Sequence, residues 1–137
     1  MNLERFINAQ QYSYSLALYE LKDGYKEGHW MWFIFPQYKG LGYSSQAQYY
    51  AIQSKEEAIS YFHHPLLGKR LIELSQVLLD LDTNDAYAIF GSIDELKLKS
   101  CMTLFYIVTK EPIFQQVLDK FYNGQLDQKT IALLEME

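Results

Sequence analysis

The sequence has little of what disulfides, membrane spans and metal sites require. It holds one cysteine in 137 residues, so no internal disulfide can form. Its most apolar run, Trp30–Phe35, is far shorter than the ~20 residues that cross a bilayer. Of its three histidines, His63 and His64 are adjacent and lack the spacing of a helical zinc pair. We therefore expect no membrane segment, no metal and no cofactor.

Other absences bear on the compartment and on the partners. The chain begins Met-Asn-Leu-Glu-Arg-Phe, without the basic and apolar regions of a signal peptide, and its single Cys101 is typical of a reducing compartment. These two features predict a cytoplasmic protein. The formal net charge of -5 makes nucleic acid an unexpected partner, because proteins that bind phosphate backbones are normally basic. The oligomeric state stays open.

Helical periodicity is the main feature that is present. Apolar residues recur at helical spacing over Leu3–Leu21, Leu66–Leu81 and Leu98–Val108. No repeat or linker divides residues 1–137. The sequence therefore predicts one compact all-α domain of six to eight helices. Capping side chains are expected at Ser44, at Ser54 and Ser92 in capping boxes with Glu57 and Glu95, and at Asp127. The residues expected to be almost fully buried are Leu74, Val77, Leu78, Met102 and Phe105.

Residues 25–42 lose the helical period and contain both tryptophans of the chain. We expect an irregular but ordered aromatic loop there, with one short extended or helical piece. Two interpretations of its aromatic side chains are open, a plug in the core or the wall of a ligand pocket. Gln10 lies on the mostly apolar face of the first helix, where it would serve as a structural bridge or as a ligand contact.

A second candidate region is the helix start at residues 91–100. Lys97 and Ser100 share one helical side, and Asp94 stands in the first turn. This side is either a solvated polar face or a phosphate anchor, in which a lysine acts as a point charge. A binding site would require His29 or Gln37 to line the same pocket as Lys97 or Ser100. Residues 40–44 contain two glycines before a helix start and are either a plain turn or an anion site.

Several segments resemble a known bacterial family. HWMWFIFPQ, GLG followed by YS, and IFGSIDELK are similar to the family called domain of unknown function 1810, and the likeness covers nearly the whole chain. It implies a compact, mostly helical domain without an established activity. A more distant likeness, through the aromatic run, SKEEA and LGKR, is to the NADAR family, which acts on N-glycosidic bonds of ribose phosphates. The glutamate of that family has no counterpart within Ser44–Tyr50, so no catalytic residue carries over.

The leading hypothesis is a small-molecule site for a nucleotide or an ADP-ribose-like ligand. If the chain hydrolyses an N-glycosidic bond, Asp94 or His29 would activate the water. The competing hypothesis is a non-enzymatic interaction module whose aromatic loop docks a protein. The sequence leaves open whether the chain is an enzyme. The expected ligand contacts are stacking walls from Trp30, Trp32 and Phe33, polar contacts from Gln10, His29 and Gln37, and phosphate contacts from Lys97 and Ser100.

Overall fold

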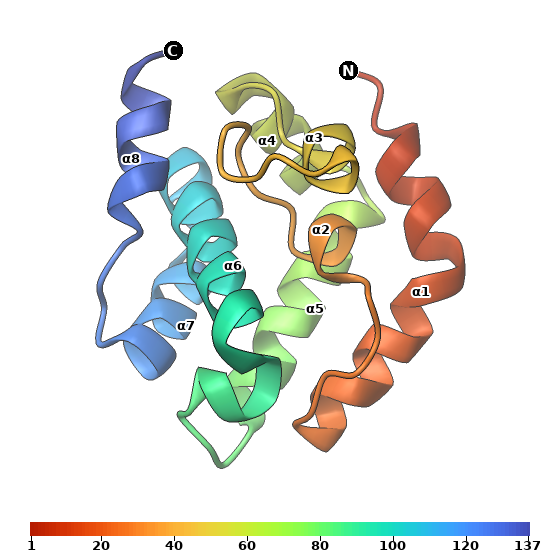
Figure 1. Ribbon diagram of the computed structural model, residues 1–137, viewed down its shortest axis with the longest axis vertical. Coiled ribbons are helices and arrows are strands. Elements are labelled where there is room, and N and C mark those ends of the chain that lie inside the picture. Colours follow the sequence, from red (N-terminus) through yellow and green to blue (C-terminus); the bar gives the residue numbers. More distant parts are fainter.

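Apolar stripes and capping side chains organise the chain into eight α-helices. The computed structural model describes residues 1–137, of which more than half are helical, so the all-α prediction is confirmed (Figure 1). The only β-type pairing is an isolated bridge between Tyr38 and Ile52. None of the helices combines the length and the hydropathy needed to cross a bilayer. The helices are α1 (Glu4–Asp23), α2 (Met31–Ile34), α3 (Ser45–Tyr50), α4 (Lys55–His63), α5 (Leu67–Asp80), α6 (Ala86–Thr109), α7 (Pro112–Tyr122) and α8 (Gln128–Glu135).

The helix ends follow the sequence signals in most places. The Ser44 hydroxyl accepts from the Ala47 amide and begins α3, and the Ser54 hydroxyl accepts from the Glu57 amide and begins α4. Asp127 caps α8 in the same way. α1 ends at Gly24, whose φ of 78° places it in the left-handed region that favours glycine. These ends confirm the predicted starts of α3, α4 and α8 and the predicted end of α1.

Two sequence-based expectations were wrong. Ser92 is exposed and its hydroxyl makes no hydrogen bond, although the backbone does leave helical geometry at Gly91 (φ 82°, ψ 173°), between Ala86–Phe90 and the helix that runs on to Thr109. Val77 is only partly buried, since it lies at the edge of the α5 stripe, whereas Leu74 and Leu78 point fully inward. The return bond of the first capping box also differs. Glu57 accepts from the Gln53 amide and from Arg5 instead of from the Ser54 amide.

The core lies where α5, α6 and α7 meet α1 and α4. In Figure 1, α1 flanks α5 on one side and α8 lies against α6 on the other. The short helix α2 passes between α1 and α3, so the predicted aromatic loop runs through the middle of the molecule. Trp30, Phe33 and Phe35 belong to the main hydrophobic cluster and are buried. The core-plug interpretation therefore holds for these three aromatic residues.

We expect Leu78→Ala to lower the free energy of unfolding by about 2–5 kcal/mol, through lost burial and the cavity left behind. Leu78 is fully buried in the main cluster. Val77→Ala, one residue away on the same helix, is the matched control, and its loss should be clearly smaller because Val77 is only partly buried. Urea titration of both variants measures the difference. Equal losses would show that burial does not set the energetics of this stripe.

Candidate functional site

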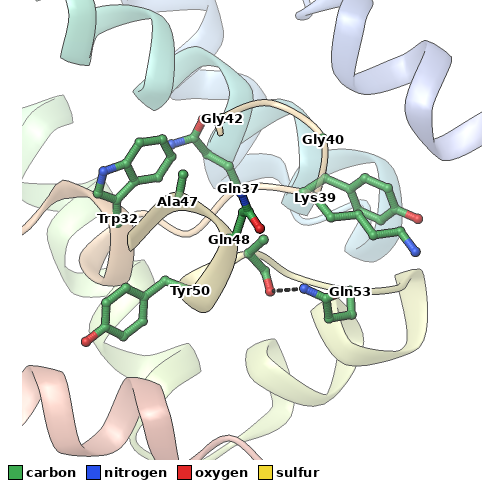
Figure 2. Close-up of a pocket in the computed structure, with 11 residues that line it drawn as sticks. Trp32, Gln37, Lys39, Gly40, Gly42, Ala47, Gln48, Tyr50 and Gln53 are labelled. Atoms are coloured by element: carbon green, nitrogen blue, oxygen red, sulfur yellow. Dashed lines mark hydrogen bonds between the residues drawn. The ribbon is translucent and has the colours of Figure 1, made fainter. Parts of the chain in front are cut away.

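A polar cavity of about 270 Å³ lies between the end of the aromatic segment and α3. We call it cavity 1. Figure 2 shows Gln37 near its centre, between Trp32 and Gln48. Lys39 is the only charged side chain of the lining, so the cavity contains no carboxylate. The residues that line it are Trp32, Gln37, Tyr38, Lys39, Gly40, Gly42, Ala47, Gln48, Tyr50, Ala51 and Gln53.

The glutamines of cavity 1 differ in their hydrogen bonds. The Gln48 amide nitrogen donates to the Tyr43 carbonyl at 2.8 Å, and the Gln53 amide nitrogen donates to the Ala51 carbonyl at 3.1 Å. These bonds leave the side-chain carbonyl oxygens of Gln48 and Gln53 without a donor. Cavity 1 therefore offers hydrogen-bond acceptors from two residues beside the amide of Gln37.

A second cavity, of about 290 Å³, lies between the same aromatic segment and α6. We call it cavity 2. Trp32 and Gln37 line both cavities, so they form the wall that the two cavities share. Lysine side chains and apolar side chains dominate the rest of cavity 2. Its lining consists of Trp32, Gln37, Leu41, Ile93, Leu96, Lys97, Ser100, Asp127 and Lys129.

Gln37 is buried in this shared wall with an amide that has no partner. Its residue is only 5% exposed, and its Nε2 is a buried donor without any hydrogen bond. Its backbone is fixed, because the Ile52 amide donates to the Gln37 carbonyl at 2.8 Å. A buried polar group normally finds a partner, and leaving one unpaired costs about 1–3 kcal/mol. The unpaired amide is therefore a position at which a ligand could supply the missing acceptor.

Gln10 provides the contrast, because it is equally buried and fully bonded. Its Nε2 donates to the Phe33 carbonyl at 2.8 Å and to the Tyr61 hydroxyl at 3.0 Å, and its Oε1 accepts from Arg70. It lines neither cavity 1 nor cavity 2. Gln10 thus acts as a structural bridge from α1 to the aromatic segment, α4 and α5, which is one of the two interpretations that its sequence position left open.

Lys97 lies over the Trp32 ring, and ion pairs connect it through Asp94 to Lys26. The Lys97 ammonium lies 4.2 Å from a Trp32 ring centroid and 3.1 Å from Asp94 Oδ1. Asp94 Oδ2 pairs with Lys26 at 2.7 Å. Burial alone would raise the pKa of Asp94, but hydrogen bonds from Lys26 and Lys97 outweigh it and lower the pKa below its ordinary value. Asp94 therefore stays ionised and holds Lys97 against Trp32.

Ser100 is engaged inside the protein rather than free. Its hydroxyl lies within hydrogen-bond distance, 3.1 Å, of both the Leu96 carbonyl and Asp127 Oδ2. The same Asp127 oxygen accepts from the Thr130 amide at 3.1 Å and from the Thr130 hydroxyl at 2.5 Å. Ser100 and Thr130 thus orient the carboxylate that caps α8, and this carboxylate forms part of the wall of cavity 2.

The structure brings some of the predicted site residues together and keeps others apart. Trp32, Gln37, Lys97 and Ser100 line one cavity, as the shared-pocket prediction required. His29 is exposed, and neither it nor Asp94 lines cavity 1 or cavity 2. Trp30 and Phe33 are likewise outside both linings, because they are packed in the core.

Several lining residues were not anticipated from the sequence. Lys39 stands in a turn, Gln48 in a six-residue helix and Gln53 in an irregular segment. Polar residues are common in such places, so no pattern singles these three out. Ile93 and Leu96 carried a signal that was missed. They are apolar residues three apart on the polar side of a helix, and they are 69% and 62% exposed.

Gly42, one of the two glycines of residues 40–44, is explained by packing. A Cβ atom at Gly42 would lie 2.7 Å from the Ala47 Cβ and 2.8 Å from the Trp32 ring. Gly42 therefore lets the loop approach Trp32 closely, and the plain-turn interpretation accounts for it. No cluster of three or more His, Cys, Asp or Glu side chains is close enough to share a metal ion.

Comparison with known proteins finds relatives without an assigned activity. Residues 1–134 match the family described as "Protein of unknown function (DUF1810)". A solved structure, the conserved hypothetical protein Rv1873 from Mycobacterium tuberculosis, is similar with 46% sequence identity and a TM-score of 0.95. The match covers 97% of this chain and 96% of that chain. A search of curated proteins finds no match.

We expect the two buried glutamines to respond in opposite ways to replacement by methionine, which has a similar shape. Gln37→Met should raise the free energy of unfolding by about 1–2 kcal/mol, since it removes a buried donor that has no partner. Gln10→Met should lower it by about 2–4 kcal/mol, since it leaves Tyr61, Arg70 and the Phe33 carbonyl without their hydrogen bonds. Urea denaturation of both variants tests this. A loss of stability in Gln37→Met as large as in Gln10→Met would mean that the Gln37 amide is satisfied.

Proposed function

We propose that this chain, which belongs to the family of proteins of unknown function called DUF1810, binds a nucleotide-like small molecule where cavity 1 and cavity 2 meet. The observation that carries the proposal is the buried, unpaired amide of Gln37. Leaving this buried amide unpaired costs folding stability. That cost is explained if a ligand, bound at the junction of the two cavities, accepts the missing hydrogen bond. The family match itself assigns no activity.

The composition of cavity 1 favours a planar group with a hydrogen-bonding edge. Gln37 supplies a donor, and Gln48 and Gln53 have unbonded carbonyl oxygens as acceptors. The aromatic ring of Trp32 offers a stacking surface beside them. A nucleobase combines donors, acceptors and a flat π face, so it suits this set of contacts better than an aliphatic ligand does.

The proposal is limited to binding. Hydrolysis of an N-glycosidic bond, which the likeness to the NADAR family suggested, needs a base within hydrogen-bond reach of the attacking water. His29 and Asp94 line neither cavity, and the carboxylate of Asp94 is paired with two lysines that lower its pKa. We propose an ADP-ribose-like molecule only as a bound ligand and not as a substrate.

The second candidate function is a non-enzymatic one, association between protein chains. The surface that favours it is on α1 and not on the aromatic loop. Tyr12, Leu16 and Tyr19 are exposed on one side of α1, and no charged residue occurs from Phe6 to Tyr19. Paired antiparallel with a second copy, this stripe would place Tyr12 opposite Tyr19 without repulsion between like charges. We propose weak self-association through it, since three side chains per copy make a small interface.

The ligand proposal predicts that adenosine or adenosine 5′-monophosphate raises the melting temperature of the wild-type protein. A ligand at 100 times its dissociation constant should add about 2.7 kcal/mol to the stability. Gln37→Met should weaken binding by about tenfold or more, because it leaves the acceptor of the ligand unpaired. The matched control is Gln46→Met, on an exposed residue that lines neither cavity. Thermal shift followed by calorimetry measures these effects. Equal affinities of the two variants would remove Gln37 from the site.

The association proposal predicts that the mean mass in sedimentation rises with protein concentration in the wild type. Leu16→Glu should restore a monomer at all concentrations, since it places a charge at the centre of the stripe. Ile59→Glu is the control, because Ile59 is also an exposed apolar residue but belongs to α4. A wild-type protein that stays monomeric up to millimolar concentration would reject this second function.

A further inference from the structure

We infer that cavity 2 is a subsite for an apolar group that carries a single negative charge, such as an aromatic or aliphatic carboxylate, and that it is not a phosphate site. This inference rests on the proposed function, since it specifies the chemistry of one half of the same site. It replaces the phosphate anchor that the sequence suggested at Lys97 and Ser100. Three features of the lining carry it, namely its apolar wall, its net charge and the state of its hydroxyl group.

The apolar wall is the first feature. Ile93 and Leu96 are mostly exposed, and Leu41 and Trp32 complete the same surface. Covering exposed isoleucine and leucine side chains in a concave lining is favourable, because it removes their apolar surface from water. A phosphate group would leave this wall in water. An apolar group would cover it.

The net charge is the second feature. Lys97 and Lys129 face one carboxylate, Asp127, so the lining carries one net positive charge. The charge of Lys97 is partly neutralised already, because its ammonium pairs with Asp94 at 3.1 Å. One anionic charge balances this lining. A second charge on the ligand would meet the Asp127 carboxylate without a further cation to offset it.

The hydroxyl group is the third feature. Ser100 Oγ lies at hydrogen-bond distance from the Leu96 carbonyl and from Asp127 Oδ2, both of which are acceptors. Its proton is therefore committed to the protein, and only its lone pairs face the cavity. The hydroxyl offers no donor to the oxygens of a phosphate or of any other anion. The donors that cavity 2 does offer an anion are the two lysines and the unpaired amide of Gln37, which suit one carboxylate or one sulfonate.

A series of naphthalene sulfonates tests the inference, because it keeps the apolar ring and increases the number of negatively charged groups on it. Calorimetry with the full chain should show that naphthalene-1-sulfonate binds about tenfold tighter than naphthalene-1,3,6-trisulfonate, a difference of about 1.4 kcal/mol. Pyrophosphate should not bind. Leu96→Ala should weaken the monosulfonate severalfold, while Ile72→Ala, at an exposed apolar residue on α5, should not.

Tighter binding of the trisulfonate or of pyrophosphate, lost at high salt, would overturn the inference and restore a phosphate anchor. Absence of binding by all three compounds at millimolar concentration would overturn it as well.

Failure of the proposed function gives a different result from failure of this inference. If adenosine shows no binding that depends on Gln37 while the monosulfonate binds at Leu96, the nucleotide-like ligand is wrong and the subsite stands. If adenosine binds through Gln37 and the monosulfonate does not bind, only the inference about cavity 2 fails.

Discussion

The burial of Trp30 against Glu20 is the interaction on which the central part of the structure depends. The indole nitrogen of Trp30 donates to Glu20 Oε1 at 2.7 Å, and the Gly28 amide donates to the same carboxylate. Burial alone would raise the pKa of Glu20, but these two hydrogen bonds lower it, so a buried carboxylate stays ionised on α1. The aromatic segment is thereby attached to α1 at one end, and its apolar residues enter the core from that point.

The other end of the segment is fixed by backbone pairing rather than by side chains. The Ile52 amide donates to the Gln37 carbonyl at 2.8 Å, and the Lys39 amide donates to the Ile52 carbonyl at 3.0 Å. Between the two attachments, Phe33, Ile34 and Phe35 are buried in the main hydrophobic cluster. Trp32 and Gln37, on either side of these residues, line both cavity 1 and cavity 2. The position of the candidate site thus follows from how the core plug is anchored.

Much of the fold could be predicted from local chemistry. Helical periodicity located α1, α5 and most of α6, and the capping residues Ser44, Ser54 and Asp127 located three helix starts. These signals are short-range, since each depends on residues three or four apart. Ser92 shows their limit. The backbone leaves helical geometry at Gly91, as a glycine there allows, but the Ser92 hydroxyl does not make the capping bond that its sequence pattern predicts.

The candidate site was less predictable, because its defining property is a buried amide that lacks a hydrogen-bond partner. Gln10 and Gln37 are the same residue type and are both buried, and only the three-dimensional arrangement gives hydrogen bonds to Gln10 and none to the amide of Gln37. Periodicity placed Lys97 and Ser100 on one side of a helix correctly. It could not show that Asp127, from a turn 27 residues beyond Ser100, would approach the Ser100 hydroxyl.

The contrast between the two glutamines also bears on why the site has this form. Folding alone favours removal of an unpaired buried amide, because an apolar residue of the same shape would avoid the cost of desolvation. Gln10 shows that this fold can satisfy a buried glutamine completely. The unpaired amide of Gln37 is therefore an exception in a fold that can supply a buried glutamine with all its hydrogen bonds. Residues that cost folding stability tend to mark functional positions. Here such a residue, Gln37, lies in the wall that the two cavities share.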